Sequence, residues 1–344
     1  MARGAGGSPM PDRALLFDAF LAAQGWGAAK RAALPGDASF RRYHRLSMDG
    51  RSALLMDAPP ERENVRPYVT IARLLKRLGL SAPEILAEDA ANGLLLIEDF
   101  GDDTYTALLK RGHDEHTLYG LAVDALTGLQ RRFTPADGEG VPPYDDQRLL
   151  AEASLLTDWF LPAAAGKPTT EALRGEYLSI WHELFAAARV VPDTLVLRDF
   201  HIDNLMLLKG RADAASCGVL DFQDAVIGPV SYDLVSLLED ARRDIAPGLA
   251  ARMYARYLDA FPKMNRAAFA ASYAILGAQR SAKIIGIFTR LCVRDGKSAY
   301  LKHIPRAWRW LEGDLKNPAL APMRDWIDRN VPPHLRTIPK SLAA

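Results

Sequence analysis

The sequence predicts a two-lobed α+β fold, in which a small lobe with an antiparallel sheet precedes a larger, mostly helical lobe. The first observation is a change of period, because residues 40–48 and 52–56 alternate as strands do whereas helical spacing dominates later. The second is length, since 344 residues exceed the usual size of one domain. We expect a disordered tail over 1–12, the small lobe over 13–101 and the helical lobe over 102–344.

Periodicity assigns a hairpin, two helices and a third strand to the small lobe. The Asp49-Gly50 pair favours a tight turn, so the runs on either side of it, residues 40–48 and 52–56, are expected to pair. The other expected elements are a helix over 15–24, a helix over 65–78 and a strand over 94–97.

The larger lobe is expected to be helical with one short hairpin. Residues 205–208 and 218–220 are brief apolar runs separated by turn-forming residues, which favours a hairpin. Helical spacing predicts helices over residues 116–131, 147–160, 170–188, 232–243, 249–260 and 268–294.

Composition excludes several classes of function. The 43 Lys and Arg nearly balance the 42 Asp and Glu, so no overall charge favours nucleic acid or an anionic membrane. Cys217 and Cys292 are too few for a disulfide framework or a cysteine zinc site. No secretory signal and no apolar span of membrane length is evident. We expect a cytoplasmic protein with no membrane insertion, and no protein partner is indicated.

Residues 196–224 have the spacing of a phosphoryl-transfer site. Asp199 is followed five positions later by Asn204, and the expected hairpin returns to Asp221. Phosphoryl transfer needs a carboxylate near the attacking hydroxyl and oxygen ligands for Mg²⁺. The protein-kinase pattern uses this spacing, which predicts Asp199 as the base and Asn204 and Asp221 as metal ligands. Neither a Walker loop nor a G-x-G-x-x-G strand-to-helix turn is present.

Two segments resemble the aminoglycoside phosphotransferase and choline kinase superfamily. Residues 197–204, L-R-D-F-H-I-D-N, are similar to its H-G-D-F-H-P-D-N loop, and residues 221–234 are similar to its D-W/F-E/Q-D-A…G-P…Y-D-L segment. Within it, L-R-D-F-H resembles the anomeric N-acetylmuramate/N-acetylglucosamine kinases of peptidoglycan recycling. The resemblance covers about residues 13–335. It implies a protein-kinase-like fold, ATP and Mg²⁺ as cofactors, and phosphorylation of an amino sugar at its anomeric hydroxyl.

The resemblance also implies a nucleotide site in the small lobe. The run L-L-L-I-E-D-F-G is similar to the last strand before the hinge, so the backbones of Glu98 and Phe100 are expected to pair with adenine. The loop over residues 36–40, with Ser39 and Phe40, is expected to cover the phosphates with its N–H groups.

One departure from the kinase pattern concerns a lysine. The third-strand lysine that pairs with the phosphates has no match, because the equivalent strand ends Leu54-Leu55-Met56. Arg41 or Arg42, from the adjacent strand, is expected to supply that charge.

Five residues are candidate contacts to the acceptor substrate: Arg198, His201, Asp224, Arg280 and Lys283. Basic residues on the helix over 268–294 recur every three or four positions, which is typical of a solvated helix face. The alternative is an anion site for the lactyl carboxylate of N-acetylmuramate.

Other interpretations stay open from the sequence. A kinase of the same fold acting on an aminoglycoside or a choline-like amine is one, and a nucleotide-binding pseudokinase is another. If residues 199–203 formed a strand, Asp199, His201 and Asp203 would share a face and indicate a metal hydrolase.

Overall fold

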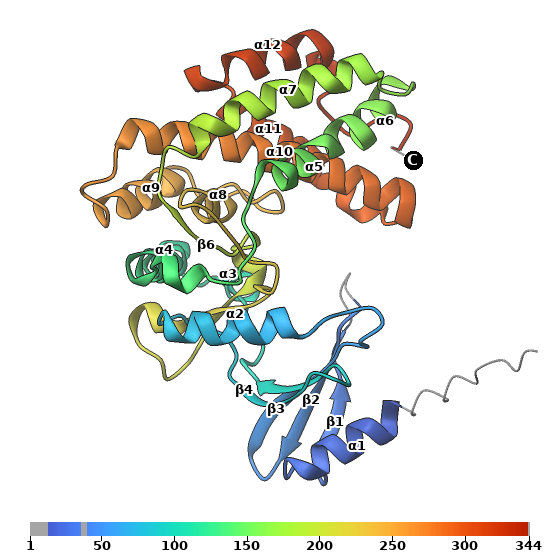
Figure 1. Ribbon diagram of the computed structural model, residues 1–344, viewed down its shortest axis with the longest axis vertical. Coiled ribbons are helices and arrows are strands. Elements are labelled where there is room, and N and C mark those ends of the chain that lie inside the picture. The colour runs from blue at the N-terminus through green and yellow to red at the C-terminus, as the bar shows by residue number, and fades with distance from the viewer. Residues whose placement is uncertain (1–12, 36–39, 343–344) are drawn as a thin grey trace, which may run out of the picture. The chain divides into compact units, whose positions relative to one another are not determined.

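The computed structural model describes residues 13–35 and 40–342 (Figure 1). The chain divides into two compact units. The first comprises the described residues up to Arg77 together with Ser81–Asp102, and the second comprises Leu78–Leu80 and the described residues from Asp103 onward. One unit is built on a sheet and the other is mostly helical, which confirms the α+β class. The expected N-terminal tail lies outside the described residues.

The first unit contains a five-stranded antiparallel sheet in the order β1-β2-β3-β5-β4. Asp49 and Gly50 both have positive φ, 51° and 74°, as a two-residue turn of this twist requires, and the expected hairpin between β2 and β3 is confirmed. The elements are α1 (Arg13–Ala23), β1 (Lys30–Ala33), β2 (Arg42–Met48), β3 (Arg51–Asp57), α2 (Arg66–Arg77), β4 (Ile85–Asp89) and β5 (Leu94–Glu98).

The two edge strands, β1 and β4, were not predicted from the sequence. All four residues of β1 are exposed, so no alternation of apolar and polar residues marks it. Strand β4 alternates only between partly buried and exposed positions, and its sequence Ile-Leu-Ala-Glu-Asp does not alternate between apolar and polar residues. The three predicted strands contribute buried residues, which is why periodicity found them.

The second unit is helical apart from two pairs of short antiparallel strands. These pairs are β6 (Asp193–Val196) with β9 (Val226–Pro229) and β7 (Leu205–Leu207) with β8 (Cys217–Val219). The helices are α3 (Tyr105–Lys110), α4 (Glu115–Arg132), α5 (Asp146–Leu155), α6 (Leu161–Ala165), α7 (Glu171–Ala188), α8 (Tyr232–Leu238), α9 (Leu249–Asp259), α10 (Arg266–Asp295), α11 (Ile304–Asp314) and α12 (Ala321–Asn330).

Several expectations for this unit are corrected. The helix expected over 147–160 is α5 followed by a π-helical turn, η2 (Leu156–Phe160). The helix expected over 232–243 ends at Leu238, because Glu239 leaves the helical conformation. Strands β6 and β9 were missed because four-residue strands without alternation carry little periodic signal. Helices α3, α11 and α12 were also not predicted.

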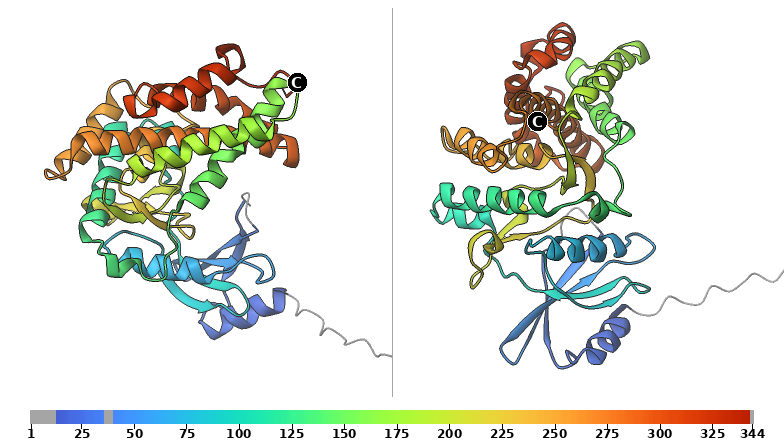
Figure 2. Two further views of the ribbon diagram at one scale, coloured as in Figure 1. Left: turned by 45° about the horizontal axis from the view of Figure 1, so that its top comes forward. Right: turned by 60° about the vertical axis from the view of Figure 1, so that its left-hand side comes forward.

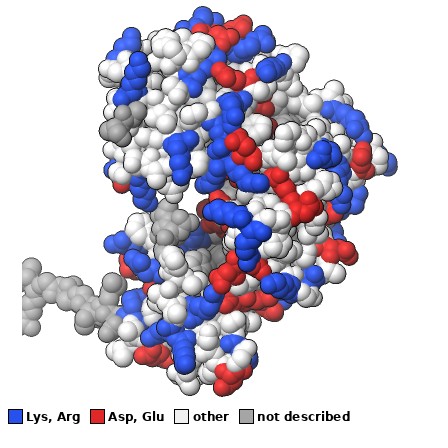
Figure 3. All heavy atoms as spheres, turned by 180° about the vertical axis from the view of Figure 1, so that it is seen from behind, with Lys and Arg blue, Asp and Glu red and all other residues white. Residues whose placement is uncertain are grey.

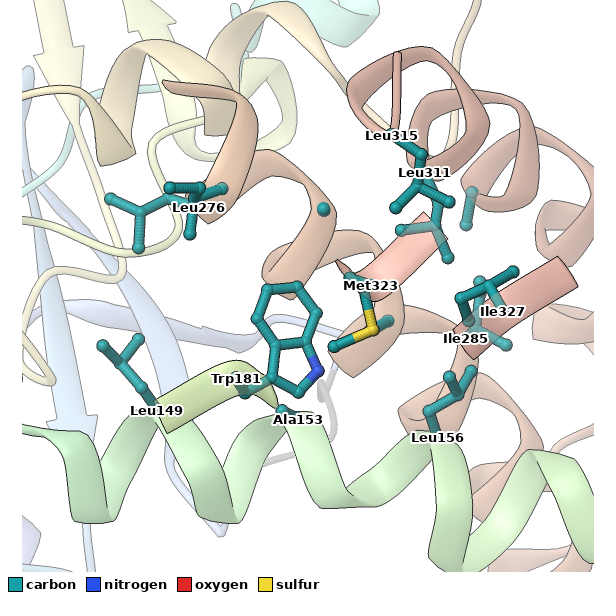
Figure 4. Close-up of a cluster of buried hydrophobic side chains, with 14 of the residues drawn as sticks. Leu149, Ala153, Leu156, Trp181, Leu276, Ile285, Leu311, Leu315, Met323 and Ile327 are labelled. Carbon is teal, nitrogen blue, oxygen red and sulfur yellow. The ribbon is translucent and has the colours of Figure 1, made fainter. Parts of the chain in front are cut away.

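Helix α10, 30 residues long, is the central element of the second unit and packs against α5, α7, α8 and α11 (Figure 2). Its apolar side meets a core in which the Trp181 indole lies beside Met323 (Figure 4). The face drawn in Figure 3 carries Lys and Arg interspersed with Asp and Glu. Among the described residues, no helix is both long enough and apolar enough to cross a membrane.

Two buried carboxyl groups meet within this unit. Glu239, just after α8, and Asp314, at the end of α11, are close enough to influence each other's protonation, and Tyr273 of α10 lies near Glu239. Burial raises the pKa of Glu239 to about 7, and burial together with Glu239 raises the pKa of Asp314 well above its usual value. Gly277 leaves the space for Asp314, since a Cβ there would lie 2.6 Å from Asp314 Oδ2.

The carboxyl pair predicts a specific pH dependence of stability. Both folded-state pKa values lie above those of the unfolded chain, so the folded state binds more protons and the free energy of unfolding falls as pH rises from about 4 to about 7. Asp314→Asn should flatten this fall and make the variant more stable than wild type at pH 8, by roughly 1 to 2 kcal/mol. Urea denaturation at pH 5, 6, 7 and 8 measures both curves; parallel curves would contradict a raised pKa of Asp314.

Candidate active site

The expected catalytic loop begins where β6 ends, and a buried carboxylate holds it. Asp233, 1% exposed at the start of α8, accepts the N–H of Leu197 at 2.7 Å and that of Arg198 at 2.9 Å. Arg198 has a φ of 69°, a conformation that non-glycine residues rarely adopt. Ser236 also donates to the Arg198 carbonyl at 3.1 Å. The two side chains of α8 therefore fix the backbone from which Asp199 projects.

The β7–β8 hairpin brings the two expected metal ligands together. Asn204 immediately precedes β7, and its carbonyl accepts the N–H of Leu220 at 2.9 Å, next to Asp221. The Asn204 side chain donates its Nδ2 to the Asp199 carbonyl at 3.0 Å. Asn204 Oδ1 accepts no hydrogen bond from the described residues.

The donor set of Asn204 and Asp221 fits Mg²⁺. An amide oxygen and a carboxylate are the hard ligands that this ion takes, and its other positions go to water and phosphate oxygens. Asp221 has a φ of 57°, and Gln223 Nε2 donates to its Oδ1 at 2.9 Å. Within 13–35 and 40–342, no group of three His, Cys, Asp or Glu residues has the geometry of a metal site.

Among the described residues, the Asp199 carboxylate accepts no hydrogen bond and has no cationic nitrogen within 4.0 Å. Burial alone raises the pKa of the Asp199 carboxyl, but nearby positive charges outweigh burial and hold the pKa below its usual value. The groups that lower it are Lys283, His201, Arg280 and Arg198.

The structure separates the acceptor-side candidates into three kinds. Arg198 and Lys283 are both paired with a carboxylate, that of Glu152. Arg280, 5% exposed, has no carboxylate within 4.0 Å among the described residues and donates to the Glu239 carbonyl at 3.3 Å. The side chain of Asp224 is exposed on the surface of this unit.

His201 is a buried polar side chain. It is 4% exposed, and its Nε2 lies 3.5 Å from Arg242 Nη1. Its Nδ1 has no hydrogen-bond partner among the described residues. Burial, and then the charge of Arg242, lower the pKa of His201. Residues 202–204 form a 3₁₀ turn, so Asp199, His201 and Asp203 do not lie along one strand. That removes the geometric basis of the metal-hydrolase interpretation.

The nucleotide-side candidates all belong to the first unit. The Phe40 N–H donates to Glu63 Oε1 at 3.3 Å, and the Glu98 N–H donates to the Glu84 carbonyl at 2.9 Å. Neither N–H is therefore free as the chain stands. The remaining candidates lie as follows: Arg42 at the start of β2, Arg41 just before it, Phe100 two residues after β5, and Ser39 outside the described residues.

Sequence reasoning missed Glu152 of α5. Its carboxylate lies inside the second unit, with 14% of the side chain exposed, and contacts both Arg198 and Lys283. The signal was present, because Glu152 falls three and four positions from Leu149 and Leu156, on the apolar stripe of its helix. A carboxylate on a buried stripe indicates a buried cationic partner.

A model of the Phosphotransferase enzyme family matches residues 30–269, more than half of the chain. The chain belongs to this family. This phosphotransferase is 38% identical to an N-acetylmuramate/N-acetylglucosamine kinase of Caulobacter vibrioides, over 92% of this chain and 96% of that protein. It is 39% identical to the protein of the same name from Pseudomonas aeruginosa, over 89% and 90%. The superfamily resemblance read from the sequence is confirmed.

Solved structures confirm the protein-kinase-like fold. A choline/ethanolamine kinase family protein from Mesorhizobium loti superposes on this phosphotransferase with a TM-score of 0.58 at 14% identity, covering 92% of this chain and all of that one. The GDP complex of an aminoglycoside 2′-phosphotransferase gives 0.57 at 15% identity, covering 89% and 99%.

The two hydrogen bonds that Asp233 accepts from the start of the loop predict the effect of Asp233→Asn. The variant keeps one oxygen for one loop N–H but turns an amide NH₂ toward the other, so the loop start loosens. We expect a loss of about 1 to 3 kcal/mol in the free energy of unfolding and a lower turnover number. Ser236→Ala, which removes the weaker tie to the Arg198 carbonyl, is the milder comparison. Equal turnover in Asp233→Asn and wild type would contradict the role of Asp233 in holding the loop.

Proposed function

We propose that this phosphotransferase moves the γ-phosphoryl group of ATP to the anomeric hydroxyl of N-acetylmuramate or N-acetylglucosamine, giving the sugar 1-phosphate. The observation that carries the chemistry is an Asp199 carboxylate without a partner among the described residues, in the same unit as Asn204 and Asp221. The names of two relatives at 38% and 39% identity over about nine-tenths of the chain support the acceptor.

Asp199, Asn204, Asp221 and Asp233 have different roles in this proposal. Asp199 accepts a hydrogen bond from the sugar hydroxyl, orients it and takes its proton as the new P–O bond forms. Asn204 Oδ1 and the Asp221 carboxylate hold Mg²⁺, which, when bound, neutralises charge on the phosphates. Asp233 keeps the backbone of Asp199 in place.

The nucleotide contacts belong to the first unit in this proposal. In this proposal the adenine contacts come from the backbones of Glu98 and Phe100, and the Glu98 N–H already donates to the Glu84 carbonyl. Strand β3 contains no lysine, so Arg41 or Arg42 supplies the positive charge toward the phosphates.

The proposed contacts to the acceptor sugar depend on which basic side chains are already paired with a carboxylate. Glu152 neutralises Arg198 and Lys283, whereas the Arg280 guanidinium is buried beside the loop without a carboxylate. Arg280 is therefore the residue we propose for the lactyl carboxylate of N-acetylmuramate. The unpartnered Nδ1 of His201 offers a second polar contact to the sugar.

A substrate panel tests the proposed function. With ATP and Mg²⁺, the purified protein should phosphorylate N-acetylmuramate or N-acetylglucosamine but neither choline nor kanamycin, and phosphorus NMR should show an anomeric phosphate. Asp199→Asn should lower the turnover number by roughly 10²-fold, because general-base assistance is lost. Turnover of choline or kanamycin alone would overturn the acceptor, and ATP binding without any turnover would favour a pseudokinase.

Arg280→Gln tests the carboxylate contact. A charge-assisted hydrogen bond contributes roughly 1.5 to 3 kcal/mol, so the specificity constant for N-acetylmuramate should fall about 10-fold to 150-fold. The constant for N-acetylglucosamine, which lacks the carboxylate, should stay nearly unchanged. Arg294→Gln, at an exposed position of the same helix, is the control. Parallel losses on both sugars would show that Arg280 only supports the fold.

A further inference from the structure

We propose that Glu152 is a positioning residue of the phosphoryl-transfer site, which holds Lys283 and Arg198 close to Asp199 while preventing either cation from pairing with it. This inference rests on the proposed function, because it assumes that Asp199 must keep a free carboxylate to accept a proton. Glu152 lies on α5, outside the catalytic loop over residues 197–204 and outside residues 221–234.

The first observation is that both oxygens of Glu152 are saturated. Oε1 accepts hydrogen bonds from Arg198 Nη2 at 2.5 Å and from Lys283 Nζ at 3.0 Å. Oε2 accepts the Tyr144 hydroxyl at 2.5 Å and Gln279 Nε2 at 3.3 Å. Burial alone would raise the pKa of Glu152, but Lys283 and Arg198 outweigh it and lower the pKa to about 2. Glu152 is therefore a fixed negative charge at every physiological pH.

The second observation is the position of the two cations. Arg198 precedes Asp199 in the chain, and Lys283 makes the largest charge contribution to lowering the pKa of Asp199. Neither comes within 4.0 Å of the Asp199 carboxylate, and Lys283 leaves only 12% of its side chain exposed. A buried cation without a counter-ion is strongly destabilised. If the charge of Glu152 is removed, Asp199 is the carboxylate to which these cations turn.

The third observation explains how Glu152 reaches Lys283 from another helix. Gly286, one turn beyond Lys283 on α10, faces the backbone of Leu155 at the end of α5. A Cβ at position 286 would lie 2.3 Å from the Leu155 carbonyl oxygen, so only glycine permits this approach. The close contact of α5 and α10 allows Glu152 to reach Lys283.

A direct salt bridge would impair Asp199, because it would occupy the lone pair that the acceptor hydroxyl needs. Glu152 pairs with both cations, and neither of them lies within 4.0 Å of the Asp199 carboxylate. Glu152 therefore keeps the Asp199 carboxylate available to the acceptor hydroxyl.

The test compares Glu152→Gln with the double variant Glu152→Gln/Lys283→Met. Glu152→Gln should lower the turnover number by 10-fold to 100-fold and leave the Michaelis constant for ATP within about 2-fold, since nucleotide binding is not touched. The double variant removes the displaced cation together with its counter-ion, so turnover should recover to within about 5-fold of wild type. If Glu152 and Lys283 only support the fold, the fold-loss of turnover in the double variant should instead equal the product of the fold-losses in the two single variants.

Asp146→Asn is the matched control. It removes a partly exposed carboxylate from the same helix, one that pairs with Arg189, and should change the thermal midpoint without changing turnover. Glu152→Asp, which keeps the charge, should retain more activity than Glu152→Gln. Unchanged turnover in Glu152→Gln, or a double variant that is worse than either single change, would overturn the proposal. If Glu152→Gln does not fold, the double variant and Glu152→Asp still decide it.

Turnover is measured in two assays, so that a wrong acceptor can be distinguished from a wrong role for Glu152. One assay uses the acceptor sugar and the other follows ATP hydrolysis without sugar, in which water takes the place of the hydroxyl. Loss of sugar turnover in wild type, with hydrolysis retained, would refute the acceptor but leave the comparison of variants intact. Equal hydrolysis and sugar turnover rates in wild type and Glu152→Gln would refute the role of Glu152.

Discussion

The site depends on one carboxylate, Asp233, which accepts two successive backbone N–H groups at the start of the loop. These bonds hold Arg198 in a backbone conformation that it would otherwise leave, because a positive φ costs a non-glycine residue about 1 to 2 kcal/mol. Burial raises the pKa of Asp233 to about 7, while the two donors favour its charged form. The direction in which Asp199 leaves the loop is therefore set by α8, 34 residues later in the chain.

A balance of buried charges surrounds this anchored loop. Asp199 and Glu152 are the two carboxylates, and Arg198 and Lys283 are the two cations, but the ion pairs are formed with Glu152 alone. An active site that needs an ionised, available carboxylate must bring positive charge near it without neutralising it. The arrangement around Glu152 meets this requirement with a residue from a helix that carries none of the residues of the phosphoryl-transfer spacing.

Two glycines of α10 make these contacts possible. Gly286 allows the α5 backbone to approach, and Gly277 leaves room for the carboxylate of Asp314. Helix α10 thereby connects the Glu152 cluster, the Glu239–Asp314 pair and the buried Arg280. The basic residues that resemble a solvated stripe in the sequence divide along this helix, since Arg280 is buried whereas Arg294 is exposed.

The sequence by itself determined the fold class, most of the strands with buried residues and the spacing of Asp199, Asn204 and Asp221, because each is a local pattern. Periodicity follows burial, so it missed the exposed edge strand β1. It also missed β6 and β9, which are mostly buried but only four residues long. The loop spacing predicted Asn204 and Asp221 as a pair because the residues that join them form the short β7–β8 hairpin.

Only the tertiary structure decided how charge is distributed around Asp199. Glu152 and Lys283 are 131 residues apart, and no local pattern states that they pair or that Arg280 is left without a carboxylate. Pairing of buried charges depends on how closely two helices approach, and here a single glycine at position 286 sets that distance. A sequence shows which residues are charged, whereas the packing of helices distant in the chain determines which charges remain available to a substrate.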